Sequence, residues 1–223
     1  MRIKSFFKSK KVLSILGIVV AVLLLLVIFF YKSIDLFIKE SVIVIKYRNQ
    51  ESFWTVFPTF KENLAFVQAN PNNDSAYDSL GQGFYALGGF SDAIKAFKRA
   101  TEIDPTNDAR WFFLAKAYMV KKEYTNARDA YYKAIEFGNS RVTEYKDLAW
   151  VYYFRIEPEK DKAYEVLKQG LEKFPNDKDL LFDLTRFYLY DKNKTEFMKY
   201  APLYLKIDPK NELILNNYKE WKP

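Results

Sequence analysis

Apolar residues are concentrated at one end of the chain. Residues 12–30 read VLSILGIVVAVLLLLVIFF, nineteen positions without a charge. As a helix this run is about 28 Å long, close to the hydrocarbon core of a bilayer, roughly 30 Å. A soluble core helix shows a polar face every 3.6 residues, whereas only Ser14 and Gly17 interrupt this run. We therefore predict a transmembrane helix over residues 12–30.

A cleaved signal peptide is the alternative interpretation of this segment. The apolar region of a signal peptide is about 7–15 residues long and ends in a small-x-small cleavage site. Here the run is longer and ends in the bulky sequence Phe29-Phe30-Tyr31-Lys32. The pattern favours an uncleaved signal anchor.

Basic residues on the two sides of the span predict its orientation. Residues 1–11 carry five basic residues and no acidic residue, while residues 31–50 carry four basic residues, two of them in the first ten. Because basic flanks stay on the cytosolic side, we expect a basic cytosolic tail over residues 1–11. The remainder of the chain is then extracytoplasmic.

Residues 31–73 are predicted to form a juxtamembrane segment. Apolar residues recur there at three- and four-residue spacing: Ile34, Phe37, Ile38, Val42 and Ile45. The spacing is compatible with a helix that extends the membrane span or lies on the bilayer. The run of residues 42–45 is also compatible with a short strand.

The second half of this segment predicts a loop followed by a helix. We expect residues 51–57 to be a loop, with Pro58 in the first turn of a helix. Phe60, Leu64 and Val67 then form one apolar stripe that ends before Pro71. This helix could be half of a degenerate repeat, or residues 31–73 could hold a whole one.

The rest of the chain is an internal repeat with a period of 34 residues. Pro71 and Pro105 are 34 residues apart, as are Pro175 and Pro209. The 70 residues between Pro105 and Pro175 correspond to two periods and a two-residue insertion near Ile156. We divide this region into repeats at residues 74–107, 108–141, 142–177 and 178–211, with a capping helix over 212–223.

Within each repeat, small and aromatic residues recur at fixed positions. The first three repeats supply Tyr77, Leu80, Gly81, Phe84, Ala93, Phe97, Ala100; Trp111, Leu114, Ala115, Tyr118, Ala127, Tyr131, Ala134; and Tyr145, Leu148, Ala149, Tyr152, Ala163, Leu167, Gly170. This pattern resembles the tetratricopeptide repeat family, whose repeat is two helices in 34 residues. The fourth repeat departs from it, because Phe197 stands where Ala is usual and Ala201 where an aromatic is usual.

The resemblance implies an all-α protein in which an N-terminal transmembrane helix precedes an α-solenoid of stacked helix-turn-helix repeats. Gly81, Ala115 and Ala149 would let the paired helices approach closely. The aromatic residues of the pattern, Trp111 and Tyr118 among them, are interpreted as filler between repeats. Gly88-Gly89 is the expected turn between the two helices of the first repeat.

Net charge and composition narrow the functional classes. The chain has a formal charge of +7, but its first thirty residues hold five basic and no acidic residues. The remaining 30 basic and 28 acidic residues leave the repeat region nearly neutral, so we expect no nucleic-acid partner. With no Cys and no His, thiol or imidazole catalysis and zinc ribbons are excluded. We predict no enzyme activity, no cofactor and no metal.

In tetratricopeptide repeat proteins the first helices of the repeats line a groove that holds a peptide or an extended segment. Three cations over apolar residues would suit a partner with acidic and hydrophobic character. The alternative is that this face is ordinary solvated surface, or that it packs on residues 33–70. By register the groove candidates are Asp78, Gln82, Tyr85, Phe112, Lys116, Met119, Lys146, Trp150, Tyr153, Phe182, Arg186 and Leu189.

One specialised ligand of the family is not expected. Its chaperone-tail receptors bind a terminal carboxylate with a clamp of Lys and Asn residues. Of the matching positions, Asp78, Gln82, Lys116, Lys146 and Trp150, only Lys146 keeps the required residue type. We therefore do not predict the C-terminus of a chaperone as the ligand.

The function predicted from sequence is that of a membrane-tethered scaffold that binds a protein or peptide segment in the groove. The chain looks similar to bacterial envelope proteins that join an N-terminal anchor to extracytoplasmic tetratricopeptide repeats and serve as assembly factors or ancillary chaperones. This resemblance implies a single-pass protein of the bacterial inner or plasma membrane. The alternative is a cytosol-facing receptor or regulator that uses the same groove.

Overall fold

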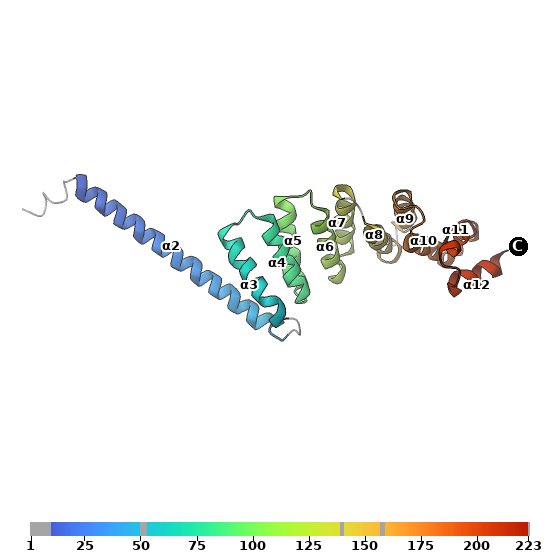
Figure 1. Cartoon of the computed structure of the whole chain (residues 1–223), viewed down its shortest axis with the longest axis horizontal. Coiled ribbons are helices and arrows are strands. Elements are labelled where there is room, and N and C mark those ends of the chain that lie inside the picture. The colour runs from blue at the N-terminus through green and yellow to red at the C-terminus, as the bar shows by residue number, and fades with distance from the viewer. Residues whose placement is uncertain (1–9, 50–52, 139–140, 157–158, 223) are drawn as a thin grey trace, which may run out of the picture. The chain divides into compact units, whose positions relative to one another are not determined.

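The computed structural model describes residues 10–49, 53–138, 141–156 and 159–222, and within these ranges every regular element is a helix (Figure 1). The predicted all-α class, with an apolar N-terminal helix before an α-solenoid, is confirmed. The chain divides into two compact units, residues 1–72 and residues 73–223. The inserted residues 157–158 lie outside the described ranges.

The first unit contains α2 (Lys10–Tyr47) and α3 (Phe53–Ala69). Figure 1 shows α2 as one uninterrupted helix. The alternative prediction of a strand over residues 42–45 is therefore wrong, because these residues belong to α2. By length and composition, residues Ile18–Tyr47 could cross a membrane, and the most apolar 18-residue window of this stretch is not buried within the protein. A signal sequence near the N-terminus passes the same test.

Packing between α2 and α3 is local to their facing sides. Phe60 of α3 is almost fully buried, as are Ile43 and Tyr47 of α2. The Gln68 side-chain amide donates to Asp35 at 2.7 Å. These contacts hold the C-terminal part of α2 against α3.

The predicted loop over residues 51–57 is wrong from Phe53 onward, because α3 begins there. Pro58 lies inside the helix rather than in its first turn. Proline at this place removes one backbone hydrogen bond, to the carbonyl four residues earlier. Residues 51 and 52 lie outside the described ranges.

The second unit is an α-solenoid of antiparallel helix pairs (Figure 1). Each pair packs internally and also against the next pair, so a continuous core forms that no single pair could bury. The helices are α4 (Asp74–Ala86), α5 (Phe90–Ile103), α6 (Asp108–Val120), α7 (Tyr124–Phe137), α8 (Val142–Arg155), α9 (Asp161–Lys173), α10 (Lys178–Tyr190), α11 (Lys194–Ile207) and α12 (Glu212–Trp221).

Short polar residues mark where several of these helices begin. Asn73, Asn107 and Asp177 precede α4, α6 and α10, and their side chains accept backbone N–H groups of the first turn. Asn193 and Asn211 do the same for α11 and α12. These caps satisfy N–H groups that have no partner within the helix. They explain why helix boundaries recur with the repeat.

Close packing within a pair depends on small residues. A methyl group at Gly81 of α4 would lie 2.6 Å from the Phe97 ring of α5, so the two helices meet without room for a side chain. In the fourth pair, Phe197 and Ala201 are both fully buried. The exchange of large and small residues therefore keeps this core filled.

The turns inside three of the pairs share a left-handed residue. Gly88 has φ +72°, as the expected Gly-Gly turn requires. Lys122 and Lys192 occupy the same place with φ 61° and 54°. In each turn the N–H of the following residue bonds back to the helix, as in Glu123 to the Tyr118 carbonyl at 2.9 Å. The turn geometry is thus conserved in the structure although only one of the three residues is glycine.

Candidate protein-binding groove

The twelve predicted groove residues all lie on α4, α6, α8 and α10, the first helices of the four pairs. Seven side chains surround a cavity of about 300 Å³, which we call the groove pocket. Four of them were predicted from sequence, namely Tyr85, Lys116, Met119 and Trp150. The other three are Val120, Tyr131 and Asp147. The pocket is built by three successive repeats, because its residues come from α4, α6, α7 and α8.

A polar pair lies among the apolar walls of the groove pocket. Lys116 Nζ is 3.7 Å from Asp147 Oδ2, and both side chains are partly exposed. The Tyr131 hydroxyl donates to the same carboxylate oxygen at 3.1 Å. Burial, together with the Asp147 charge, raises the pKa of Tyr131 well above its usual value, so this hydroxyl remains a donor.

Neighbouring side chains hold the aromatic walls in place. The Arg155 guanidinium lies over the Trp150 ring, 4.7 Å from its centroid. Tyr85 meets Phe90 edge to face, with ring centroids 5.2 Å apart. Such contacts limit the rotamers of both aromatic side chains. The groove pocket is therefore preformed.

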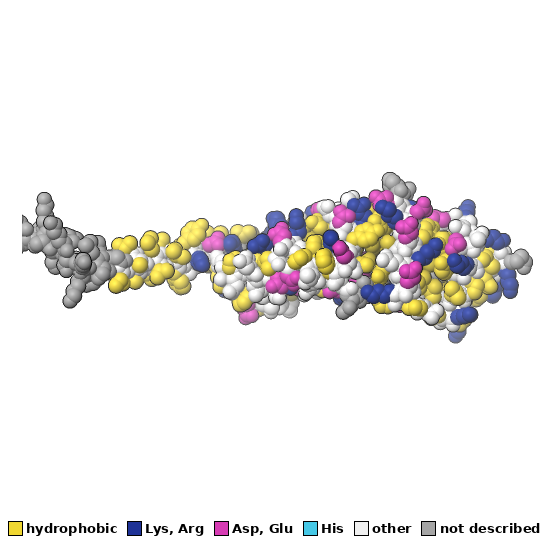
Figure 2. All heavy atoms as spheres, turned by 90° about the horizontal axis from the view of Figure 1, so that it is seen from above, with side chains coloured by type: hydrophobic (Ala, Val, Ile, Leu, Met, Phe, Trp, Pro, Cys, Tyr) yellow, Lys and Arg dark blue, Asp and Glu magenta, His cyan; other side chains and the backbone are white. Residues whose placement is uncertain are grey.

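Each of the three groove cations, Lys116, Lys146 and Arg186, has a carboxylate within ion-pair distance. Lys116 pairs with Asp147 as described, Lys146 contacts Asp179 at 2.7 Å and Arg186 contacts Asp183 at 2.6 Å. Figure 2 shows, on one face, acidic and basic side chains interspersed over the repeats. Asp147 lies on α8, and Asp179 and Asp183 lie on α10. Asp147 and Asp179 are distant in sequence from the lysines with which they pair, whereas Asp183 is one helical turn from Arg186. An acidic ligand would have to displace these pairs.

Two of the predicted groove residues belong to the core. Tyr153 is 6% exposed, stacks on Phe187 at 3.8 Å and donates to Asp191 at 2.8 Å. Leu189 is 9% exposed. This corrects the prediction that Tyr153 and Leu189 line the groove. Helices α8 and α10 turn these two side chains toward the interface between repeats.

The remaining predicted residues lie along the same helices outside the groove pocket. Gln82 donates to Asp78 at 3.2 Å, and burial raises the pKa of the Asp78 carboxyl. Lys116 lies over the ring of Phe112, 5.8 Å from its centroid, and Arg186 lies over Phe182 at 5.1 Å. These residues extend the half-buried surface toward both ends of the groove.

Metal chemistry finds no support in the part of the chain that the structure describes. There, no group of three or more Asp and Glu side chains is arranged to hold a metal ion. The polar groups of the groove pocket are instead a cation, a carboxylate and a phenol. This set suits hydrogen bonding to a ligand.

Comparison with known proteins identifies the repeat. Residues 79–141 match the family described as Tetratricopeptide repeat. The protein named Superkiller complex protein 3 of Mus musculus is 27% identical over 84 residues, which cover 38% of this chain and 5% of that protein. The chain therefore spans a small part of the length of this curated relative.

Solved structures show the same fold. A crystal structure of MamA superposes with a TM-score of 0.60 at 24% identity, covering 68% of this chain and 87% of that chain. A crystal structure of YrrB, described as a TPR protein with an unusual peptide-binding site, gives a TM-score of 0.58 at 18% identity, covering 71% and 81% of the two chains. The expected solenoid architecture is thereby confirmed.

Proposed function

We propose that this chain, whose residues 79–141 match the tetratricopeptide repeat family, is a membrane-tethered scaffold that binds a segment of a protein partner in the groove pocket. The observation that carries the proposal is the convergence of three successive repeats on one preformed cavity of about 300 Å³. That volume falls within the range of ligand pockets, roughly 300–1,000 Å³. The similarity to YrrB, described as having a peptide-binding site, supports a peptide ligand.

The lining of the groove pocket favours an apolar anchor residue in an uncharged stretch of backbone. Tyr85, Met119 and Trp150 supply apolar walls. Lys116 and Asp147 supply one donor and one acceptor, which together match a peptide N–H and C=O. A free carboxylate would pair with Lys116 but would repel Asp147. We therefore propose that hydrophobic character, rather than net acidity, selects the partner.

The proposed tether is α2. Attachment to a membrane confines the groove and any partner at the same surface, which raises their effective concentration. Weak binding in the groove would then suffice for a role as an assembly factor or ancillary chaperone of envelope proteins. With the N-terminus in the cytosol, the repeats would act on the extracytoplasmic side. We propose no catalytic step.

The alternative topology places the repeats in the cytosol, as a receptor or regulator with the same groove. A reporter fused after residue 223 and active on one side of the membrane distinguishes the two. Activity of an extracytoplasmic reporter supports the proposed orientation. Activity of a cytosolic reporter contradicts it and leaves groove binding intact.

Photo-crosslinking tests the proposed groove. The photoreactive amino acid p-benzoylphenylalanine is placed at Met119 in the groove pocket and, as a matched control, at the exposed Glu165 on α9. In native membranes we expect a discrete adduct with a partner protein from position 119 and none from position 165. Equal crosslinking from both positions, or none from position 119, would contradict the proposal.

A further inference from the structure

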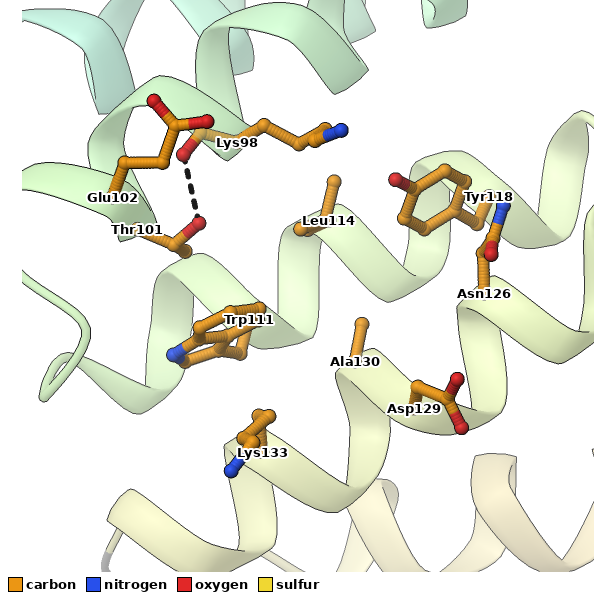
Figure 3. Close-up of a pocket in the computed structure, with 10 residues that line it drawn as sticks. All are labelled: Lys98, Thr101, Glu102, Trp111, Leu114, Tyr118, Asn126, Asp129, Ala130 and Lys133. Atoms are coloured by element: carbon orange, nitrogen blue, oxygen red, sulfur yellow. Dashed lines mark hydrogen bonds between the residues drawn. The ribbon is translucent and has the colours of Figure 1, made fainter.

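A second cavity opens among helices of the first two repeats, and we call it the outer pocket. It has a volume of about 370 Å³ and lies between α5, α6 and α7 (Figure 3). Leu114 and Ala130 form its buried floor, and the rings of Trp111 and Tyr118 lie at its two ends. Sequence analysis assigned both rings to filling space between repeats, yet here they border open space.

The outer pocket is rigid. The Trp111 indole N–H donates to the Pro105 carbonyl at 2.7 Å, which fixes the ring at one end. Leu114 and Ala130 are each 3% exposed, so they are anchored in the core behind the floor. A preformed apolar cavity loses little conformational freedom when a side chain enters it.

The repeat itself indicates what fills such a cavity. Tyr118 has counterparts one and two repeats later, Tyr152 and Tyr188. Tyr132 packs edge to face on Tyr152 at 6.1 Å, and the two hydroxyls lie 3.1 Å apart. Tyr200 stacks on Tyr188 at 5.7 Å. Tyr164 also stacks on Tyr188, at 4.4 Å. Both later counterparts of Tyr118 therefore pack against at least one further tyrosine ring.

The first interface lacks that ring within the described residues. The position of Tyr132 is occupied one repeat earlier by Lys98, and the position of Tyr200 is occupied two repeats earlier by Ala130. No aromatic contact of Tyr118 is formed in the described part of the chain. The outer pocket is thus open beside Tyr118, where the counterpart Tyr152 is covered by the ring of Tyr132.

Lys98 gives the outer pocket a charge preference. It extends from α5 toward the Tyr118 end of the cavity (Figure 3). Among the described residues no carboxylate lies within ion-pair distance of it, whereas Lys133 on the opposite rim pairs with Glu136 at 2.6 Å. The two carboxylates of the lining, Glu102 and Asp129, pair with Arg99 at 3.3 Å and with Arg128 at 2.7 Å. An acidic residue beside the incoming ring would therefore complement Lys98.

We infer that the outer pocket binds a tyrosine side chain of a protein partner, flanked in the partner by an acidic residue. The ring would pack against Tyr118 as Tyr132 packs edge to face on Tyr152 and as Tyr200 stacks on Tyr188. The inference concerns a site separate from the groove pocket and does not depend on the proposed function. It would give the solenoid two binding faces.

Fluorine NMR tests this inference on the full-length chain in lipid nanodiscs. The four tryptophans are labelled as 5-fluorotryptophan, and the Trp111 resonance is assigned with Trp111→Phe. The probe is the water-soluble peptide N-acetyl-Asp-Tyr-Asp-amide, and its control carries Leu in place of Tyr. For a single side chain we expect binding in the millimolar range.

Variants built from the later repeats provide the decisive comparison. Lys98→Tyr and Ala130→Tyr each place the missing ring inside the outer pocket, and Lys95→Tyr on the exposed side of α5 is the matched control. We expect a saturable shift of the Trp111 resonance in the wild type and in Lys95→Tyr. The shift should be lost in at least one folded filling variant.

Three results would overturn the inference. One is an unchanged Trp111 resonance through millimolar tyrosine peptide. Another is an equal shift with the leucine peptide, which would indicate a general apolar cleft. The third is a full shift retained in both filling variants. Crosslinking from Met119 is independent of all three, so failure here leaves the groove proposal intact.

Discussion

Lys116 on α6 and Asp147 on α8 meet across the groove pocket, with 3.7 Å between Nζ and Oδ2. The carboxylate also accepts the Tyr131 hydroxyl at 3.1 Å, so it is positioned from two sides. Both charged side chains remain partly exposed. Exposed pairs of this kind contribute about 0–1 kcal/mol to stability, so the arrangement is better explained by ligand binding than by folding.

Replacing Lys116 by Met separates these two roles. The substitution keeps the length of the side chain and removes the charge. We expect the free energy of unfolding to change by less than about 0.5 kcal/mol, because the pair is solvated. We expect the dissociation constant of the partner segment captured from Met119 to rise about tenfold, the cost of one charged hydrogen bond. Urea unfolding and a binding titration of the same variant measure both. A large loss of stability with unchanged binding would assign the pair to the fold.

Gly81→Ala tests the close approach of α4 and α5. The added methyl group would lie 2.6 Å from the buried Phe97 ring, so we expect a loss of about 1–3 kcal/mol in unfolding free energy. The same change at Gly170 places the methyl group at about 3.0 Å from Tyr145 and should cost less. Thermal unfolding of both variants measures which substitution loses more stability.

A second substitution shows whether Phe97 causes the loss. Phe97→Leu in the Gly81→Ala background should recover part of the stability, because it opens space where the methyl group enters. Strictly additive losses in this double-mutant cycle would contradict a direct contact.

Two lysines have a left-handed backbone conformation, and replacing them should stabilise the protein. Lys122 and Lys192 have φ of 61° and 54°, a region that costs a residue with a side chain about 1–2 kcal/mol. Glycine removes this strain but adds freedom to the unfolded chain. We expect Lys122→Gly and Lys192→Gly each to add roughly 0.5–1 kcal/mol, measured by urea unfolding. Lys121→Gly is the control, since Lys121 has φ −76°, and it should not stabilise.

Buried phenols make the protein sensitive to alkali. Burial is the main cause that raises the pKa of Tyr131 and of Tyr152, and it raises that of Tyr204 to about 12. An unfolded tyrosine titrates near 10, so the folded state keeps its phenol protons more tightly. Stability is then fully present below pH 10 and is lost above it, by about 1.4 kcal/mol per pH unit for each such tyrosine.

Unfolding free energies at pH 8, 10 and 11 measure this slope. Tyr204→Phe removes one titrating group. Above pH 10 the loss of unfolding free energy per pH unit should then be smaller, by up to about 1.4 kcal/mol, the contribution of one proton. Phenolate absorbance that develops fully at pH 10 while the helical signal persists would contradict the raised pKa values.

The repeat spacing was sufficient to predict the architecture. The 34-residue period, with Gly81 and its alanine counterparts, fixes where helices must meet, and polar caps such as Asn73 fix where they begin. Loop residues 53–57 were mispredicted because an internal Pro58 reads as a helix start, although a helix tolerates it at one hydrogen bond's cost. Residues 31–73 lack the clear 34-residue repeat from which the helices of the later residues were predicted.

The candidate sites were less predictable, because they depend on pairs that sequence register does not show. Helical spacing placed Lys116 and Trp150 on the right helices but could not reveal that Asp147 faces Lys116. The helical register of Tyr153 predicts that it lines the groove, yet the ring of Phe187 stacks on it. The outer pocket could have been suspected from one signal, the lysine at position 98 where the next repeat has Tyr132.

The central claim is that the groove pocket binds a partner segment, and Trp150→Ala tests it most directly. The matched control is Tyr190→Ala, which truncates an exposed aromatic outside the groove pocket. The measurement is the dissociation constant of the segment crosslinked from Met119, for full-length protein in nanodiscs. Truncating a central aromatic anchor costs about 2 kcal/mol, so we predict about 30-fold weaker binding for Trp150→Ala and no change for Tyr190→Ala. Equal affinity of the wild type and a folded Trp150→Ala variant would contradict the account.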